Sequence, residues 1–402
     1  MSTNKHIAVV GVTSTSHIYP SLSLVRELVA RGHRVSYAVG DSKCDLIAPT
    51  GAAFVGYPSV LPDPQNDKAI VPAEAPKDAG EVMQIFLDEA MVALPHLIAR
   101  FEQDPPDLVL YDAGAMVGPV LAHRYGVPAV QFLVMAMTIL DEQDKAKHRE
   151  LLDSLGSSES ARRYYETCNA WLADNGIDRD ANEWQSNPGP VLSLFPRAMQ
   201  PNADQAPDTV RFVGPCFDPH RLTDRSWSPP DNGNRVLLVA FGNSFNNLLE
   251  VYRMCIDAFA NSDWHLVLAV GDRVDVRELD PHPDNVEVRR SVPQLTVLES
   301  ASAFVTHAGM GSCTEALWYA VPTVAIPQAI DQFGNAARLA ELGAGTSLSV
   351  EEITSQTLRA AVEAVAGDPD IAARLAAIQK ELRDDAGVDV AANAVESFLV
   401  AH

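Results

Sequence analysis

The chain has 402 residues, 47% of them hydrophobic, which is enough for two domains of roughly 200 residues, each with its own core. Its 53 acidic and 30 basic residues give a net charge of -23, which disfavours nucleic acid or an anionic membrane as a partner. The sequence shows no signal peptide and no apolar run of the ~20 residues that a membrane span needs. Five scattered cysteines are typical of reduced thiols, so we expect a cytoplasmic protein.

The N-terminal part alternates between strand and helix patterns. Ile7–Val12 and Val35–Val39 are apolar runs of strand length, separated by apolar residues at helical spacing. Pro20 suits the first turn of that helix, and Gly32 lies just past its end. The alternation continues with strands at Leu108–Tyr111 and Ala129–Leu133 and a helix at Val117–His123 between them. This order predicts a doubly wound parallel sheet.

Three segments interrupt the alternation. Leu61–Gly80 is rich in Pro, Asp and Ala without a period, which predicts a long functional loop. Gln143–Trp184 is charged and helix-patterned, and Pro215–Asn234 holds four prolines and suits a linker. We therefore expect an N-terminal domain at 1–214, a linker at 215–234, a C-terminal domain at 235–380, and a C-terminal helix at 381–402 that packs back on the first domain.

The alternation restarts after the expected linker. Strands are expected at Val236–Phe241, Leu266–Val270, Val286–Val288, Ala303–Thr306 and Thr323–Ile326, and helices near 248–260, 294–299 and 312–319. The fold class is thus α/β, with two Rossmann-like doubly wound sheets. We expect the two sheets to face a central cleft, because ligands of such sheets bind at the carboxyl ends of the strands.

The most informative segment surrounds His307. An apolar strand ends at Thr306, a turn with Gly309 and Gly311 follows, and a helix begins near Ser312. Glycines let a ligand approach the backbone, and a helix N-terminus attracts a diphosphate. His307 could donate a hydrogen bond to a phosphate oxygen, or carry charge if its pKa were raised. The same pattern also suits a turn that only packs a helix on a sheet, with Ser312 as the N-cap.

A resemblance separates these readings. SVPQLTVLESASAFVTHAGMGSCTEALWYAVPTVAIPQAIDQFGNA resembles the nucleotide-sugar signature of family 1 glycosyltransferases of the GT-B fold. It is most similar to bacterial enzymes that glycosylate macrolides, enediynes of the calicheamicin type and other secondary metabolites. HIAVVGV and HIYPSLSLVRELVARGHRVSYAV resemble the first strand–helix–strand unit of that group. PDLVLYDAGAMVGPVLAHRYGVPAV and VLLVAFGNSF resemble it more weakly, so the resemblance covers most of the chain.

The resemblance implies roles for residues of the donor site. The diphosphate would be held by His307, Gly309, Gly311 and Ser312, with Asn243 approaching from the opposite side. Glu315 would take a ribose hydroxyl, Val292 and Gln294 would line the base site, and Asp331 and Gln332 would bind the sugar hydroxyls. From the pattern alone, Asp331 and Gln332 also suit a cap for a helix that starts near Asn335. Many relatives stack a Trp on the base where this chain has Ser291, which leaves thymidine or uridine open.

The resemblance also implies a general base in the loop GVTSTSHIYP, paired with a carboxylate at Asp112. Aligned with the family, the base position falls on Thr15, and His17 corresponds to a second, structural histidine. His17 could serve as the base only if the loop were shifted by two residues. A missing base would suit an acceptor whose nucleophile is already acidic, such as a phenol, an N-hydroxyl or a thiol.

We therefore expect an inverting, metal-independent glycosyltransferase that moves a deoxysugar from a nucleoside diphosphate, with TDP favoured, to a lipophilic secondary metabolite in antibiotic biosynthesis. We expect no metal and no cofactor besides the nucleotide-sugar co-substrate, and we leave a homodimer open. Two alternatives remain: a nucleotide-sugar epimerase of the same fold, and a catalytically silent nucleotide-sugar-binding partner protein. A dehydrogenase is disfavoured because no G-x-G-x-x-G follows the first strand.

Overall fold

The computed structural model describes residues 4–62, 78–137, 139, 158–242, 246–329, 331–385 and 387–400. Asn243 and most of the expected loop at Leu61–Gly80 lie outside these ranges. The chain forms two compact units, which are considered one at a time. Unit 1 comprises Met1–Leu194, Asn202–Cys216 and Gly387–His402, and unit 2 comprises Phe195–Pro201 and Phe217–Ala386.

Unit 1 is built on a seven-stranded parallel sheet with the order β3-β2-β1-β4-β5-β6-β7. Its strands are β1 (His6–Val10), β2 (Arg34–Gly40), β3 (Ala53–Tyr57), β4 (Leu108–Asp112), β5 (Ala129–Leu133), β6 (Val191–Ser193) and β7 (Val210–Phe212). The chain winds outward from β1 in one direction and from β4 in the other. The boundary between β1 and β4 is therefore the topological switch point of this sheet, where ligands of doubly wound folds bind.

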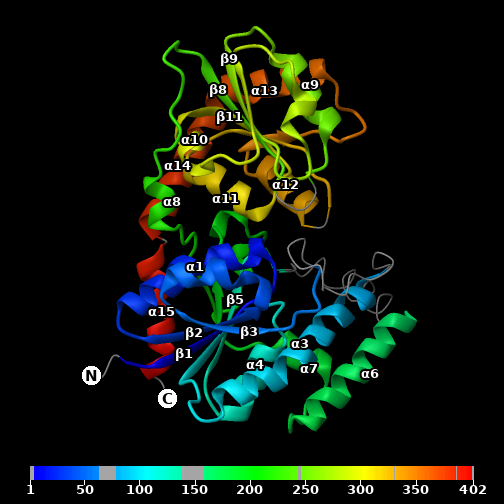
Figure 1. Cartoon of the computed structure of the whole chain (residues 1–402), viewed down its shortest axis with the longest axis vertical. Coiled ribbons are helices and arrows are strands. Elements are labelled where there is room, and N and C mark those ends of the chain that lie inside the picture. Colours follow the sequence, from blue (N-terminus) through cyan, green and yellow to red (C-terminus); the bar gives the residue numbers. More distant parts are fainter. Residues whose placement is uncertain are drawn as a thin grey trace. The chain divides into compact units, whose positions relative to one another are not determined.

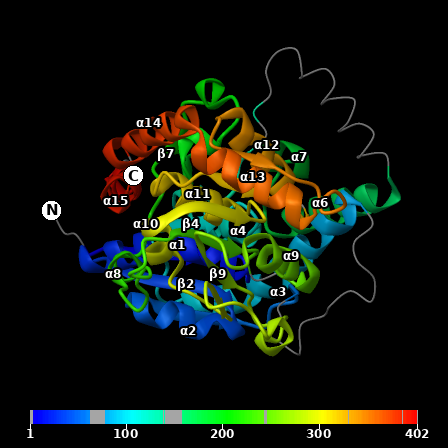
Figure 2. The ribbon, with the colours of Figure 1, turned by 90° about the horizontal axis from the view of Figure 1, so that it is seen from above.

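Helices cover both faces of the first sheet (Figure 1). They are α1 (Thr15–Ala30), α2 (Cys44–Ile47), α3 (Ala79–Phe101), α4 (Val117–Tyr125), α6 (Glu159–Asp174), α7 (Ala181–Ser186) and α15 (Val388–Val400). Alternate residues of β1 and β4 enter one core with α1 and α15 and another core with α3, α4 and α6. Helix α6 lies alongside α3 in both views (Figure 1 and Figure 2).

Unit 2 contains a six-stranded parallel sheet with the order β10-β9-β8-β11-β12-β13. Its strands are β8 (Arg235–Ala240), β9 (Trp264–Ala269), β10 (Val286–Arg289), β11 (Ala301–Thr306), β12 (Thr323–Ala325) and β13 (Gly345–Ser347). Its helices are α8 (Pro219–Thr223), α9 (Leu249–Phe259), α10 (Gln294–Ser300), α11 (Met310–Trp318), α12 (Gln332–Glu341), α13 (Ser355–Gly367) and α14 (Pro369–Asp385). The switch point lies between β8 and β11.

The prediction of two doubly wound parallel sheets is confirmed. Helix α1, however, begins at Thr15, so Pro20 lies inside it and not in its first turn as expected. A proline there removes only the one backbone hydrogen bond that its missing N–H would have made, and the helix continues through it. The earlier start places His17 within the first turn of α1.

The expected linker is largely part of unit 2. From Phe217 onwards the chain belongs to that unit, and α8 packs against α10. Trp227 is buried in a core with residues of β8, and its indole N–H donates to Glu287 at 3.1 Å. Burial of this large aromatic side chain orders a segment that its prolines suggested would be loose.

The chain returns to unit 1 at its C-terminal end, from residue 387 onwards. Helix α15 packs on α1, and Arg31 of α1's C-cap donates to Glu396 and Asp389 at 3.0 Å each. The returning segment is thus shorter than the expected 381–402, because α14 extends to Asp385.

One helix of the described residues, α3, is long and apolar enough to cross a membrane by length and composition alone. Its buried side chains Leu87, Ala90, Leu94 and Leu97 belong to a core of unit 1. Glu89 also lies on its buried face. The apolar character of α3 is therefore accounted for by its packing on the sheet.

Candidate active site

The switch point of the first sheet brings His17 and Asp112 together. His17 follows β1, in the first turn of α1, and Asp112 is the last residue of β4. Nδ1 of His17 lies 2.9 Å from Oδ2 of Asp112, and the N–H of Gly114 donates to Oδ1 at 2.8 Å. The Asp112 carboxylate is 1% exposed, whereas the His17 side chain is 18% exposed. A carboxylate can only accept, so Nδ1 carries the proton and Nε2 is the basic atom of a neutral ring.

The structure pairs Asp112 with His17 and not with Thr15, the position on which the family alignment placed the base. Thr15 is the first residue of α1, and the two carboxylate oxygens of Asp112 are directed at His17 and Gly114. Thr15 was assigned by aligning the loop with the family, and such an alignment does not record which side chain contacts Asp112. The acidic acceptor was inferred from a missing base, and His17 is a candidate for that base.

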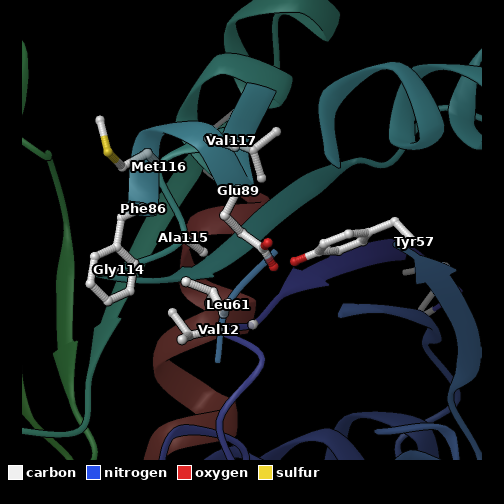
Figure 3. Close-up of a pocket in the computed structure, with 11 residues that line it drawn as sticks. Val12, Tyr57, Leu61, Phe86, Glu89, Gly114, Ala115, Met116 and Val117 are labelled. Carbon is white, nitrogen blue, oxygen red and sulfur yellow. The ribbon is translucent and has the colours of Figure 1, made fainter. Parts of the chain in front are cut away.

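A small apolar cavity of about 10 Å³ lies beside Gly114, the residue that donates to Asp112. Its walls come from the loops after β1, β3 and β4 and from α3 and α4, and they include Val12, Leu61, Phe86, Ala115, Met116 and Val117 (Figure 3). Polar groups reach it through Glu89 and Tyr57, whose side chains point toward each other. The cavity has room for about one water-sized molecule, so it marks an apolar surface close to the Asp112 loop and is not a formed acceptor site.

The switch point of the second sheet carries the turn at His307. This turn connects β11 to α11 and places Ala308 in the left-handed region, with φ 60°. Gly309 is the N-cap of α11, and no side chain caps the helix. The N–H groups of the first turn, at Met310, Gly311 and Ser312, are thus not satisfied by a cap residue. Together with the helix dipole, they form a site suited to a diphosphate.

His307 is held in its neutral form. Burial lowers its pKa to about 4, opposed in part by a backbone hydrogen bond with Ala240. The ring packs over two glycines: a Cβ on Gly242 would lie 2.8 Å from His307 Nε2, and one on Gly309 only 2.4 Å. The expectation that His307 could carry a charge is therefore not supported. A neutral ring carries a single N–H, so His307 can donate to a phosphate oxygen only by giving up its hydrogen bond with Ala240.

Gly309 and Gly311 are glycines for different reasons. Gly309 leaves room for the His307 ring, whereas a Cβ on Gly311 would meet no protein atom within 4 Å. Packing therefore does not require glycine at 311, and the open space beside it is where a ligand could approach the backbone. Ser312 lies inside α11, so its reading as the N-cap is wrong.

Glu315 and Gln294 lie in contact with each other. Glu315, 6% exposed, accepts from Gln294 Nε2 and from Arg221 Nη2, each at 2.6 Å. Arg221 comes from α8, in the segment that had been expected to be a linker, so nothing in the sequence pattern pointed to it. Val292 packs against the neighbouring core. The predicted ribose and base residues are thus gathered in one place, with their polar groups oriented by Arg221.

Asp331 and Gln332 begin α12, earlier than the start near Asn335 that we expected. Asp331 has the N-cap place but makes no side-chain cap. The Gln332 amide oxygen accepts from the N–H groups of Gln328 and Ala329, at 2.8 and 3.2 Å. Gln332 therefore shapes the loop before α12, and Asp331 is the member of the pair better placed for a ligand.

Asn335 was missed by the sequence reasoning, which treated it only as a helix start. Its buried amide donates to Asp331 Oδ2 at 2.9 Å and to the carbonyl of Ala308 at 3.0 Å. It thereby ties the carboxylate of Asp331 to the strained turn beside His307. Asn243, the other predicted diphosphate residue, lies outside the described residues. No group of three or more His, Cys, Asp or Glu among the described residues could hold a metal ion.

Similar proteins align with this chain over its full length. Oleandomycin glycosyltransferase of Streptomyces antibioticus is 41% identical over 409 aligned positions, covering 100% of this chain and 92% of that protein. The chain is a family 1 glycosyltransferase of the GT-B fold. Residues 253–397 of this glycosyltransferase also match the family described as Erythromycin biosynthesis protein CIII-like, C-terminal domain.

Solved structures agree with this assignment. The glycosyltransferase of kitacinnamycin superposes with a TM-score of 0.88 and is 39% identical, covering 99% of this glycosyltransferase and 100% of that chain. CalG4, the calicheamicin glycosyltransferase, superposes with a TM-score of 0.86 and is 30% identical, covering 99% of each chain. The predicted resemblance to bacterial antibiotic glycosyltransferases is thus confirmed.

Proposed function

We propose that this glycosyltransferase moves a deoxysugar, with inversion, from a nucleoside diphosphate to a hydroxyl of a lipophilic natural product. The observation that carries the proposal is the hydrogen bond between His17 and Asp112 close to an apolar cavity. The uncapped start of α11 beside neutral His307 supports a diphosphate as the leaving group. The two sets of residues provide the two functions that glycosyl transfer requires, a base and a stabilised leaving group.

In the proposed reaction, Nε2 of His17 takes the proton of the acceptor hydroxyl. The acceptor oxygen attacks the anomeric carbon from the face opposite the diphosphate, and the bond from that carbon to the diphosphate oxygen breaks. Its electron pair leaves with the diphosphate, so the anomeric configuration inverts. The buried Asp112 carboxylate orients the ring through Nδ1 and stabilises the imidazolium that forms.

The negative charge that develops on the diphosphate would be received by the N–H groups of the first turn of α11. These donors are fixed by the fold before the donor binds, which is the arrangement that lowers a barrier most effectively, and the N–H of His307 would join them by leaving Ala240. We propose that these donors suffice without a metal ion, because the sequence has no Asp-x-Asp pair beside the turn.

The natural-product acceptor is proposed from the apolar cavity and from the names of the relatives, which act on oleandomycin and calicheamicin. TDP is proposed as the nucleotide on the same likeness, with uridine as the alternative. With His17 in place as a base, an ordinary alcohol is an adequate acceptor and an acidic nucleophile is not required. Cys168, Cys216, Cys255 and Cys313 are buried and free, consistent with the proposed cytoplasmic location.

A nucleotide-sugar epimerase or a silent binding protein is less well supported. Neither activity explains why a histidine base and its carboxylate lie close to an apolar cavity. The two alternatives also predict different results in the assay below, because an epimerase turns over its donor without an acceptor.

The test uses the purified full chain with α-linked TDP- and UDP-sugars and a panel of lipophilic alcohols, with and without EDTA. We expect a β-linked product, identified by the coupling constant of its anomeric proton, formed equally well with EDTA. Turnover of TDP-sugar without acceptor would favour the epimerase. TDP binding without transfer to any member of the panel would favour the silent binding protein, and a product with retained configuration would overturn the proposed mechanism.

A further inference from the structure

Glu89 is a carboxylate on the buried face of a core helix, and it lines the apolar cavity beside Gly114. It is 6% exposed and lies on α3, among the alanines and leucines that pack on the sheet. Within the described ranges, no Lys, Arg or His forms an ion pair with it. A buried carboxylate without a cation is costly unless several donors satisfy it, so its retention on this face calls for an explanation.

The donors come from two different loops. Oε1 accepts from the hydroxyls of Ser59 at 2.8 Å and Thr13 at 3.2 Å, and Oε2 accepts from the N–H of Val60 at 2.7 Å. Thr13 lies in the loop after β1, and Ser59 and Val60 lie in the loop after β3. One carboxylate therefore connects the carboxyl ends of two strands to α3.

Thr13 also connects a third strand, β2, to the hydrogen bonds of Glu89. Its Oγ1 accepts from the N–H of Gly40, the last residue of β2, at 3.0 Å. A Cβ on Gly40 would lie 2.6 Å from Ser59 Cβ and 2.7 Å from Thr13 Cγ2, so glycine at this point lets the two loops meet. The Tyr57 phenol points at Glu89 (Figure 3). Burial, and then the charge of Glu89, raise the pKa of Tyr57 well above its usual range and keep it a neutral donor.

The position of Thr13 connects this network to the catalytic pair. Thr13 precedes Ser14, the N-cap of α1, and His17 lies in the first turn of that helix. The chain from Gly11 to Ser14 is the only covalent connection from β1 to that turn. Whatever fixes Thr13 therefore fixes where α1 starts and how His17 meets Asp112.

We infer that Glu89 is a positioning residue for proton transfer: through Thr13 it sets the place of His17 relative to Asp112 and to the acceptor. It does not touch the reacting atoms itself. This inference rests on the proposed role of His17 as the base. A displacement of a catalytic group by about 1 Å can lower a rate by up to about 100-fold, so a residue of this kind affects kcat strongly.

The test exploits the acceptor's acidity. A general base contributes much to the attack of an aliphatic alcohol and little to that of a phenol, which is already acidic. A loss of proton transfer therefore depends on the acceptor, whereas a merely structural loss lowers both rates alike. We compare kcat for the phenolic and the hydroxymethyl forms of one aromatic scaffold, with TDP-glucose as donor and TDP affinity measured separately.

Glu89→Leu removes all the acceptors, and we expect about a 10-fold loss of kcat with the alcohol, at most about 2-fold with the phenol, and unchanged TDP affinity. Thr13→Val should reproduce this pattern, and the double variant should lose little more than either single one. Glu89→Gln should restore most of the rate, because an amide can still pair with Thr13, Ser59 and Val60. Ser59→Ala is the matched control: it breaks one Glu89 bond but leaves the Thr13 contact, and should show no acceptor dependence.

His17→Ala in the same acceptor series separates the two proposals. If His17→Ala itself shows no acceptor dependence, the base assignment fails and the inference fails with it. If His17→Ala shows the dependence but Glu89→Leu and Thr13→Val slow both acceptors equally, the inference alone is overturned. If Glu89→Leu does not fold, the comparison of Thr13→Val with Ser59→Ala distinguishes the same two outcomes.

Discussion

Each sheet places a histidine at its switch point, on opposite sides of it, and the two rings have different surroundings. His17 follows β1 at the switch point of the first sheet, and His307 follows β11 at that of the second. His17 is hydrogen-bonded to the buried carboxylate of Asp112. His307 packs over Gly242 and Gly309, and burial lowers its pKa to about 4.

The difference shows how surroundings select one of the two uses of an imidazole. A carboxylate at Nδ1 stabilises the protonated ring, so His17 can accept a proton and hold it during a reaction. An apolar enclosure destabilises the protonated ring, so His307 stays neutral and acts through hydrogen bonds and not by holding a proton. We therefore assign proton transfer to the first site and leaving-group binding to the second, and the predictions below test this division.

The largest expected effect is a loss of kcat that should occur at the first site and not at the second. His17→Ala should lower kcat with an aliphatic alcohol about 1000-fold, because the base is lost, and should leave the affinity for TDP unchanged. Steady-state kinetics and calorimetric titration with TDP measure the two quantities. His307→Ala should instead weaken TDP binding.

Asp112→Asn tests the role of His17 through its hydrogen-bond partner. The amide would donate to Nδ1 where the carboxylate accepted, which moves the ring proton to Nε2 and removes the basic atom. We expect a loss of about 100-fold or more in kcat with the donor affinity retained. A loss of TDP affinity in either His17→Ala or Asp112→Asn would contradict the division of labour.

The sequence predicted most of the fold but only part of this comparison. Nine of the described strands and the turn at His307 were predicted within a few residues of their ends, because apolar periodicity and glycines are local signals; β3, β6, β7 and β13 were not predicted. Pro20 misled the prediction of where the first helix begins, because a proline inside a helix resembles one at its start.

Other parts of the site depend on contacts that sequence spacing does not record. Arg221 reaches Glu315 across 94 positions, and Asn335 reaches Ala308 across 27. Glu89 meets Thr13 across 76 positions and looked like one charge in an otherwise apolar helix. Such residues are identified only when the fold has brought their partners together.

A second prediction concerns the acid stability conferred by His307. Its pKa in the folded state, about 4, is below the ordinary value of 6.5, so between these values the unfolded chain binds a proton that the folded one does not. The stability is fully present above pH 6.5 and is lost as pH falls toward 4, by at most about 3 kcal/mol. His307→Gln should lack this loss. Urea denaturation from pH 7 to pH 4 measures the difference, with the exposed His123→Gln as the control.

Parallel pH dependences for wild type and His307→Gln would contradict the neutral, enclosed state of this ring. The neutral state would be supported if the fall of the free energy of unfolding between pH 6.5 and pH 4 disappeared in His307→Gln but not in His123→Gln. The contrast with His17 would then rest on a measured property of each ring's surroundings.

The smallest expected effect tests the helix end beside His307. Gly311→Ala puts a Cβ into space that no protein atom occupies within 4 Å, inside the first turn of α11. Alanine favours a helix over glycine, so the free energy of unfolding should rise by a few tenths to about 1 kcal/mol. The same methyl group would stand where a phosphate approaches the backbone, and TDP affinity should fall about 10-fold.

The two effects have opposite signs: the free energy of unfolding should rise while the affinity for TDP falls. This combination distinguishes a ligand site from a helix start that only packs. Gly367→Ala, at the end of α13, also adds a Cβ that meets nothing within 4 Å and should stabilise the fold without changing TDP affinity. If Gly311→Ala behaves like Gly367→Ala in both measurements, the start of α11 does not hold the diphosphate. His307 would then be a packing residue, and the comparison between the two histidines would reduce to one catalytic ring and one structural ring. A stabilised variant that binds TDP weakly would instead show that glycine at 311 is kept for the ligand at some cost to the helix.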